Sequence, residues 1–337
     1  MERLVPVDAA KQLPTLTREV NTNMVASTRP IIARVNYLNA LAAQDIDSGI
    51  SAGQSDGNLL SGVWSNIFYS FAEQKMHKEI PGYKSSSFGG IVGIDFALRE
   101  TSTVGFALSY VDGQTKYKNQ KLGDKTKTST TILSLYGMEY ITKNWFAQGF
   151  MSYGMNDVKK SEQRILSTGA SGIAKAKYKP SSFSIGALGG YNYVTKDYLI
   201  TPQAGFNFTN IDKVKYNESG INNLNLFVSQ KVSNALEGIV GIRASKEVKV
   251  SNLTIVPELH GFLNYDFIAK TGKSNARLTG MVNSLPVNND KTSRLTLNIG
   301  ANVTMHSNMM EYQLEYDIYI LNKFIGNQVA VKARINF

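Results

Sequence analysis

Residues 327–337 read NQVAVKARINF, a stretch in which apolar and polar side chains alternate. One face of this stretch is apolar, formed by Val329, Val331, Ala333, Ile335 and Phe337, and the other is polar, formed by Gln328, Lys332, Arg334 and Asn336. Successive side chains of a β-strand point to opposite sides of the sheet, so a period of two indicates a strand with one apolar and one polar face. The segment is predicted to be such a strand, closed by an aromatic residue.

The same alternation recurs upstream in the chain. In residues 295–305 the apolar side chains, Leu297 and Ile299 among them, alternate with polar ones such as Asn298. Counting every segment that can be written this way predicts about twelve strands. They lie near residues 60–72, 86–98, 102–112, 128–141, 144–155, 182–194, 198–209, 229–245, 252–266, 293–305, 309–321 and 327–337.

The connections between these strands alternate in length. Short ones are 99–101, 141–143, 195–197, 246–251 and 306–308, and long ones are 113–127, 156–181, 210–228 and 267–292. Short turns at one end and long loops at the other are typical of transmembrane barrels, whereas a soluble sandwich has no reason to sort its loops in this way. The predicted fold is an all-β transmembrane barrel of about twelve antiparallel strands, with Leu297 and Ile299 facing lipid and Asn298 facing the lumen.

The N-terminal part of the chain has a helical period instead. In residues 14–43 the apolar side chains Ile31, Val35 and Leu38 share one face, and Pro30 is predicted as the first helical residue. The helix is Asn-rich and polar, so we expect it to lie inside the barrel lumen over about residues 15–45. A linker, DSGISAGQSDGN at residues 47–58, follows it. Two parts are predicted: a segment with the luminal helix and the linker, 1–57, and an outer-membrane barrel, 58–337.

Composition excludes several classes of protein. The chain of 337 residues has no Cys, which excludes disulfides and thiolate metal sites. Its net charge of +10 resides in predicted loops, so no nucleic-acid partner is expected. These basic residues, expected to be solvated, are Lys116, Lys118, Lys121, Lys125 and Lys127, and Lys159, Lys160, Arg164, Lys175, Lys177 and Lys179.

Export must rely on sequence other than the first residues shown. No run of 18 apolar residues exists, which excludes a transmembrane helix. The start, MERLVPVDAAK, has no apolar core of a signal peptide. We therefore expect the chain to be the C-terminal piece of a longer precursor.

Charged residues on the polar faces are the candidate luminal residues. Three acids, Asp95, Glu139 and Glu258, are predicted to point inward as counter-charges for the basic residues Arg34, Lys332 and Arg334. His260 is expected in the lumen beside Glu258, but no H-x-x-x-H pattern accompanies it. The pattern G-x-S-x-G occurs only within the Ser/Gly linker, at 49–53 and 53–57, and not as an elbow between a strand and a helix. No hydrolytic site, cofactor or metal ion is predicted.

Several motifs together resemble one known family. They are Gly-Val-Trp at 62–64, Gly-Ile-Asp-Phe at 93–96, Leu-Tyr-Gly at 135–137, Pro-Gln-Ala at 202–204, Arg-Pro-Ile-Ile-Ala-Arg at 29–34 and the ending VAVKARINF. The chain resembles the C-terminal translocator domain of type V autotransporters, and most of all the rickettsial surface cell antigen group. In that family the last strand, here Val329, Val331, Ala333, Ile335 and Phe337, acts as the assembly signal for the outer membrane.

The resemblance implies a function and partners. Such a domain inserts in the bacterial outer membrane and carries an N-terminal passenger to the cell surface, while the helix fills the pore. The implied partners are the passenger, the barrel-assembly machinery, and outer-membrane lipid with its lipopolysaccharide. Two other functions remain open, a porin-like diffusion channel and an outer-membrane enzyme barrel.

The resemblance also raises self-cleavage. Some autotransporters cut themselves where a helix Asn attacks its own backbone carbonyl, within the motif Glu-Val-Asn-Asn-Leu-Asn. Residues 19–24 of this chain read Glu-Val-Asn-Thr-Asn-Met, which makes Asn21 and Asn23 the candidate cleavage residues and replaces the second Asn by Thr22.

Overall fold

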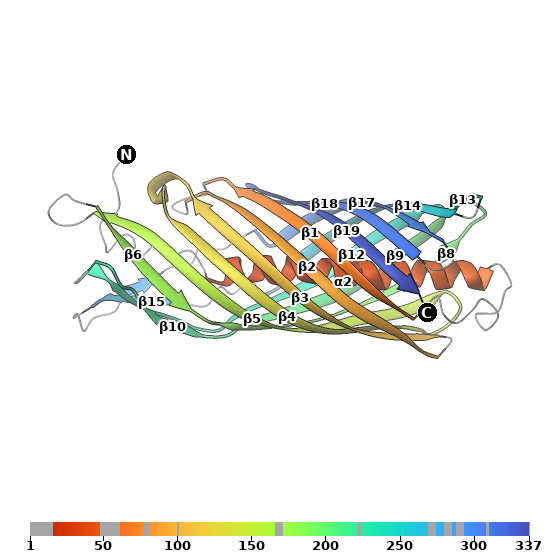
Figure 1. The fold of residues 1–337 in the computed structure, drawn as a ribbon, viewed down its shortest axis with the longest axis horizontal. Coiled ribbons are helices and arrows are strands. Elements are labelled where there is room, and N and C mark those ends of the chain that lie inside the picture. The colour runs from red at the N-terminus through yellow and green to blue at the C-terminus, as the bar shows by residue number, and fades with distance from the viewer. Residues whose placement is uncertain are drawn as a thin grey trace.

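Twelve antiparallel strands form a closed barrel around one long helix, α2 (Leu16–Asp47) (Figure 1). In this computed structural model the described residues are 16–47, 61–76, 81–99, 101–165, 171–221, 224–251, 253–268, 274–279, 285–287, 293–307 and 310–336. The barrel strands are β1 (Gly62–Gln74), β2 (Tyr83–Arg99), β3 (Ser102–Tyr117), β4 (Lys125–Tyr140), β5 (Trp145–Ile165), β7 (Ser181–Tyr191), β9 (Leu199–Ile211), β12 (Ser233–Ser245), β14 (Leu253–Asp266), β17 (Leu295–His306), β18 (Met310–Leu321) and β19 (Phe324–Asn336).

Each strand pairs with its neighbours around the ring, and the two ends of the sheet meet. Residues 62–74 of β1 pair with residues 324–336 of β19, so the first and last strands close the barrel. Because the closed barrel has no free strand edge, the backbone N–H and C=O groups of every strand find partners in neighbouring strands, as they must in a medium without water. All twelve predicted strands are confirmed, and their ends agree within five residues except in β5, which extends to Ile165 instead of residue 155.

The predicted long loops are wrong in part, because they contain further strands. β6 (Ser171–Tyr178) pairs with an extension of β5, and β10 (Val214–Asn217), β11 (Leu226–Gln230), β15 (Ser274–Leu278) and β16 (Leu285–Val287) form a separate four-stranded sheet. Two short strands, β8 (Tyr193–Val194) and β13 (Val248–Val250), pair with β9 and β14. A 3-10 turn, η2 (Asn119–Lys121), connects β3 to β4. Among these pairings, that of β11 with β15 joins segments that are distant in sequence, so a local period does not reveal it.

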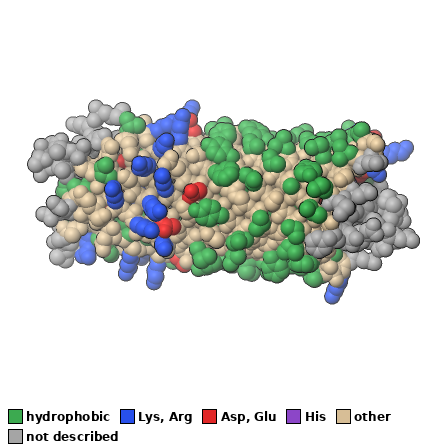
Figure 2. Space-filling view, in the orientation of Figure 1, with side chains coloured by type: hydrophobic (Ala, Val, Ile, Leu, Met, Phe, Trp, Pro, Cys, Tyr) green, Lys and Arg blue, Asp and Glu red, His purple; other side chains and the backbone are tan. Residues whose placement is uncertain are grey.

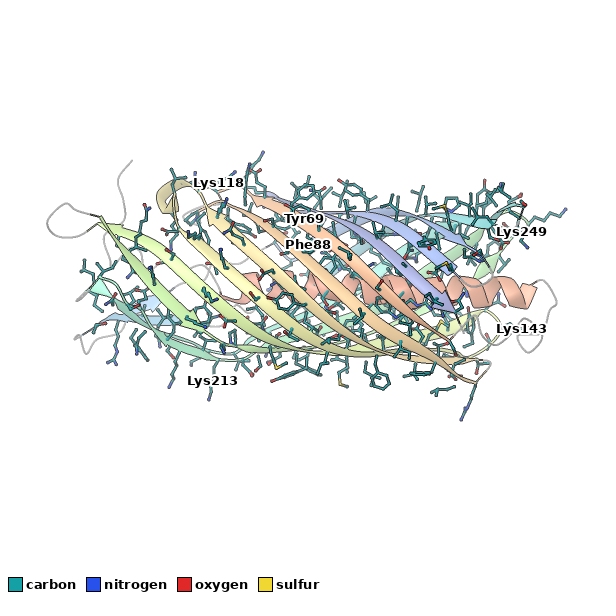
Figure 3. All side chains as sticks on the ribbon, in the orientation of Figure 1. Tyr69, Phe88, Lys118, Lys143, Lys213 and Lys249 are labelled. Atoms are coloured by element: carbon teal, nitrogen blue, oxygen red, sulfur yellow. The ribbon has the colours of Figure 1, made fainter. Side chains whose placement is uncertain are left out.

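The outer surface of the barrel carries the apolar side chains. Ile299 is 48% exposed, whereas the adjacent Asn298 is 8% exposed and faces the lumen. Hydrophobic side chains cover one continuous stretch of the outside, and basic side chains gather beyond one end of that stretch (Figure 2). Tyr69 and Phe88 point outward within it, whereas Lys118 lies at one end and Lys143 at the other (Figure 3). This arrangement, an apolar band around a polar interior, is that of a barrel in lipid.

The luminal helix predicted over about residues 15–45 is confirmed, but the prediction that Pro30 is its first residue is wrong. α2 begins at Leu16, so Pro30 lies inside the helix and not at its first turn. No helix among the described residues has an apolar stretch long enough to cross a bilayer. The linker at 48–58 and the terminal Phe337 lie outside the described residues.

Candidate functional site: the barrel lumen and its helix

α2 docks along one side of the lumen. It contacts β2, β3, β4, β5, β7, β8 and β9. Near its N-terminal end Asn23 reaches Thr128 of β4, close to the long connections, and near its C-terminal end Asn39 reaches Tyr140 of β4, close to a short turn. The helix therefore runs through the barrel from the long-loop end to the short-turn end.

The interior proline is compensated by the barrel wall. Pro30 has no N–H and cannot donate to the carbonyl of Ala26, four residues earlier in the helix. Nε2 of Gln328 on β19 donates to this carbonyl oxygen at 3.3 Å. Two residues earlier, the hydroxyl of Thr28 donates to the carbonyl of Met24 at 2.7 Å. The wall thus supplies the hydrogen bond that the helix lacks, which joins α2 to the last strand of the barrel.

A buried charge network ties the middle of the helix to three strands. Arg34 lies with Nη2 2.6 Å from Oδ2 of Asp95 on β2 and Nη1 3.5 Å from Oε2 of Glu311 on β18. Arg334 on β19 approaches the same two carboxylates, at 3.7 Å from Asp95 and 3.6 Å from Glu311. Nζ of Lys332 lies 2.6 Å from Oε1 of Glu311. Three cations thus share two carboxylates, and the luminal positions predicted for Arg34, Asp95, Lys332 and Arg334 agree with the structure.

Two aromatic side chains hold the Asp95 carboxylate in place. Nε1 of Trp64 donates to the hydroxyl of Tyr136 at 2.7 Å, and this hydroxyl donates to Oδ1 of Asp95. The two rings meet edge to face, with centroids 6.2 Å apart. Buried charges are tolerated where further hydrogen bonds satisfy them. The alternation of apolar and polar residues does not reveal that Trp64, Tyr136 and Glu311 belong to this network.

Amide side chains make further contacts along the helix. Oδ1 of Asn36 accepts hydrogen bonds from Gln148 and Gln203, both at 2.9 Å. Oδ1 of Asn39 accepts from the hydroxyl of Tyr140 at 2.6 Å and from Nδ2 of Asn192 at 2.9 Å. The Asn-rich composition of residues 15–45 indicates that the helix makes polar contacts, although it does not indicate which residues of the barrel wall are the partners.

The opposite side of the lumen is hollow. A cavity of about 400 Å³ lies beside α2, and its lining includes Arg29, Glu237, His260, Glu315 and Asp317. The guanidinium carbon of Arg29 lies 3.0 Å from the ring centroid of Tyr319. Charged and polar groups line this cavity together with apolar ones, so it offers both room and hydrogen-bonding partners for water. The helix therefore fills only part of the lumen.

His260 and Glu258 lie in this part of the lumen, as predicted. Nε2 of His260 is 2.9 Å from Oδ1 of Asp317, and its Nδ1 is 3.6 Å from Oε1 of Glu258. Glu258 also pairs with Arg243 and accepts a hydrogen bond from Asn302 at 2.8 Å. Among the described residues, the polar groups paired with this imidazole are carboxylates, and a hydroxyl nucleophile is not among them.

Glu139 is predicted to face the lumen, and this prediction is wrong. Its carboxylate lies on the outer surface, where Oε1 accepts a hydrogen bond from Thr101 at 2.9 Å and Oε2 accepts one from Ser102. Along β4 the side chains of Tyr136 and Tyr140 point inward, so Glu139 has the outward parity of Leu133 and Leu135. It lies at the short-turn end, where water can hydrate the charge.

Some basic residues of the long connections are also buried, contrary to the prediction that they are solvated. Lys160 and Lys121 lie with Nζ 2.5 Å and 3.2 Å from Oε1 of Glu162. Arg164 lies 3.0 Å from Glu162 and also pairs with Glu218. The strands beyond the apolar band enclose these side chains, so alternation directs them inward and not into solvent.

One acid of this enclosed cluster has a shifted pKa. Burial raises the pKa of Asp124 to about 6, although the ammonium of Lys121, 3.9 Å away, opposes the rise. Its carboxylate accepts a hydrogen bond from the backbone N–H of Gln163 at 2.7 Å.

The last strand presents its apolar face outward. Val329, Val331 and Ile335 are exposed on the outer surface, and Ala333 is half-buried on the same face. Their neighbours Lys332 and Arg334 are buried in the lumen. The alternation predicted for this strand agrees with the structure, while its role as an assembly signal stays a prediction.

Comparisons with known proteins agree with this architecture. A family model described as "Autotransporter beta-domain" matches residues 63–317. Outer membrane protein A of Rickettsia rickettsii is 34% identical, over 98% of this chain and 15% of the relative. Outer membrane protein B of Rickettsia prowazekii is 30% identical, over 94% of this chain and 20% of the relative. The chain thus spans no more than 20% of the length of either relative.

Solved structures with the same fold are also found. The translocator domain of autotransporter NalP from Neisseria meningitidis superposes with a TM-score of 0.66 at 18% identity, covering 89% of this chain and 98% of that one. The β domain of the Bordetella autotransporter BrkA superposes with a TM-score of 0.61 at 16% identity, covering 82% and 100%. At these identities the likeness concerns the fold.

Proposed function

Because this chain belongs to the autotransporter β-domain family, we propose that it is the translocator that carries an N-terminal passenger across the outer membrane and anchors it there. The barrel is an integral protein of the bacterial outer membrane. Domains of this family are not themselves enzymes.

The direction of α2 is the observation that carries this proposal. The N-terminal end of α2 lies with Asn23 against Thr128 and Ser87, at the long-loop end, which faces the cell exterior in outer-membrane barrels. The C-terminal end lies with Asn39 near Tyr140, at the periplasmic end. Sequence that precedes α2 would thus emerge at the cell surface.

The proposed role of the helix after transport is that of a plug. α2 packs along the strands from β2 to β9 and leaves a cavity of about 400 Å³ on the other side of the lumen. A porin-like diffusion channel instead keeps its lumen open to solutes. The helix contacts support a closed translocator in preference to a diffusion channel.

We expect deletion of residues 1–45 to raise single-channel conductance severalfold, because water and ions would then fill the space of α2. The measurement uses the purified full chain and the deletion variant in planar bilayers. Glu139→Gln is a matched control, since Glu139 lies outside the lumen and its change should leave conductance unaltered. Equal conductance of the full chain and the deletion variant would contradict the plug.

Two partners are proposed on the last strand and on the surface. The outward apolar face of Val329, Val331 and Ile335, joined to β1 at barrel closure, supports recognition by the barrel-assembly machinery. Phe337 would complete this signal. The exposed lysines beyond the apolar band support a contact with lipopolysaccharide.

We further propose that Asn23 anchors the helix and does not cleave the chain. Its Nδ2 donates to the carbonyl of Thr128 at 3.1 Å and to Oγ1 of Thr130 at 3.0 Å, and its Oδ1 accepts from Ser87 at 3.1 Å. A nitrogen engaged by two wall acceptors is held away from its own backbone carbonyl. The side chain of Asn21 lies outside the described residues.

Mass spectrometry of the mature protein from cells tests anchoring against cleavage. We expect no new N-terminus at residue 22 or 24 after the barrel has folded. Asn23→Ala should leave processing unchanged and weaken helix docking, seen as a higher conductance. An N-terminus at 24 that disappears in Asn23→Ala would establish self-cleavage and overturn the anchoring proposal.

A further inference from the structure

Exposed lysines form two rows across neighbouring strands beyond the apolar band. In the first row, Lys84 of β2 pairs directly with Lys116 of β3, which pairs with Lys125 of β4. All three side chains point outward and are exposed.

The second row lies one step nearer to the apolar band. Lys127 of β4 pairs with Lys159 of β5, which pairs with Lys177 of β6. These side chains are exposed as well. Directly opposed residues of neighbouring strands have Cβ atoms about 5 Å apart, so each row is a line of adjacent ammonium groups.

Such rows of like charge are expected to lower the stability of the folded barrel unless a bound group offsets the repulsion. Like charges directly opposite one another destabilise a sheet. Carboxylates offset the repulsion only at one end of each row, where Lys84 lies 3.8 Å from Glu73 and Lys177 lies 3.3 Å from Asp157. Within the described part of the chain, Lys116, Lys125, Lys127 and Lys159 form no ion pair. The repulsion thus calls for an external anion.

The height of the rows indicates which anion. Lys84 lies four residues beyond the outward-facing Phe88, Lys159 four residues beyond Met155, and Lys127 six residues beyond Leu133. At about 3.3 Å per residue and a tilt near 40°, these lysines lie about 10–15 Å outside the hydrocarbon. A phospholipid headgroup layer is only about 5–8 Å thick. A taller headgroup built on phosphorylated sugars reaches this level.

We propose that the two lysine rows, Lys84–Lys116–Lys125 and Lys127–Lys159–Lys177, bind the phosphate groups of outer-leaflet glycolipids. This rests on the orientation in the proposed function, which places the rows at the cell-surface end. Basic side chains lie beyond the apolar band along the barrel axis, so one lipid layer can contact both the apolar band and the lysines (Figure 2). Bound phosphates offset the repulsion between the ammonium groups and fix the position of the barrel along the membrane normal.

The experiment measures binding of the purified full chain, in neutral detergent, to fluorescent rough lipopolysaccharide that carries lipid A and core phosphates. The first variant is Lys127→Gln/Lys159→Gln/Lys177→Gln. Its matched control is Lys143→Gln/Lys196→Gln/Lys249→Gln, which removes the same charge from exposed lysines at the periplasmic end. Folding is verified for each by the gel-mobility shift between unheated and heated samples.

We expect the row variant to bind about 100-fold more weakly and the control variant to change by less than about threefold. Enzymatically dephosphorylated lipopolysaccharide should bind the unaltered chain as weakly as the row variant binds the intact glycolipid. The row variant should fold at least as well as the unaltered chain, because repulsion is removed.

Three results would overturn the proposal: unchanged binding of the row variant, equal weakening in the control, or equal binding of dephosphorylated glycolipid. Surface display of a passenger, measured separately in cells, reports on the translocator function. Loss of display with intact glycolipid binding would contradict the translocator alone, and the reverse would contradict the lysine rows alone. If an acidic polypeptide bound to the lysine rows and intact lipopolysaccharide did not compete with it, the rows would be assigned to a protein partner instead.

Discussion

Asp95→Ala is expected to destabilise the folded barrel by about 3–5 kcal/mol, the cost of removing one partner of a buried ion pair. Its carboxylate accepts a hydrogen bond from Nε of Arg34 at 2.8 Å and lies 3.7 Å from Nε of Arg334. Without it, Arg34, Arg334 and Lys332 retain Glu311 as the one carboxylate of this network. The free energy of unfolding can be measured by urea titration in lipid vesicles, followed by tryptophan fluorescence.

Two comparisons separate this effect from a general loss of charge. Glu139→Ala removes a carboxylate on the outer surface, so the free energy of unfolding should change by no more than about 0.5 kcal/mol. In an Arg34→Met background the helix cation is gone, so Asp95→Ala should cost less than in the unaltered chain. Equal costs for Asp95→Ala in both backgrounds would show that Arg34 and Asp95 are not energetically coupled.

Ile299→Arg is expected to cost about 2–4 kcal/mol in folding into vesicles, whereas Asn298→Arg should be tolerated. Ile299 is exposed on the outer surface, so arginine there would meet lipid. Asn298 lines the luminal cavity of about 400 Å³ and donates to Asp317 at 2.8 Å, so an arginine would have both room and a counter-charge. The folded fraction in vesicles, read from gel mobility, compares the two variants.

Adjacent positions of one strand make this a stringent test of the membrane orientation. Equal tolerance of arginine at Ile299 and Asn298 would contradict an apolar band in lipid. A second check is that the unaltered chain should require detergent or lipid to stay dispersed, because its apolar side chains surround the outside. A monomeric chain soluble in plain buffer would refute the barrel.

Several features of the fold follow from the sequence alone. Alternation predicts the twelve barrel strands and the opposite environments of Ile299 and Asn298, because a period of two depends on neighbouring residues. The same reasoning places Asp95, Lys332 and Arg334 in the lumen. Glu139 has the same parity along β4 as Leu133 and Leu135, so the alternation itself indicates the outer face for this residue.

The tertiary structure decides which distant residues meet. Gln328 donates to the Ala26 carbonyl that Pro30 leaves without a donor, and Arg34 joins Asp95 to Glu311, although these groups are far apart in sequence. The sheet beyond the membrane and the lysine rows likewise depend on the register between strands. Register and helix docking are set by contacts between remote segments, whereas alternation reports only on which face each residue occupies. The sequence therefore determines the barrel and its polarity, and the three-dimensional pairing determines its network of luminal charges and its surface rows.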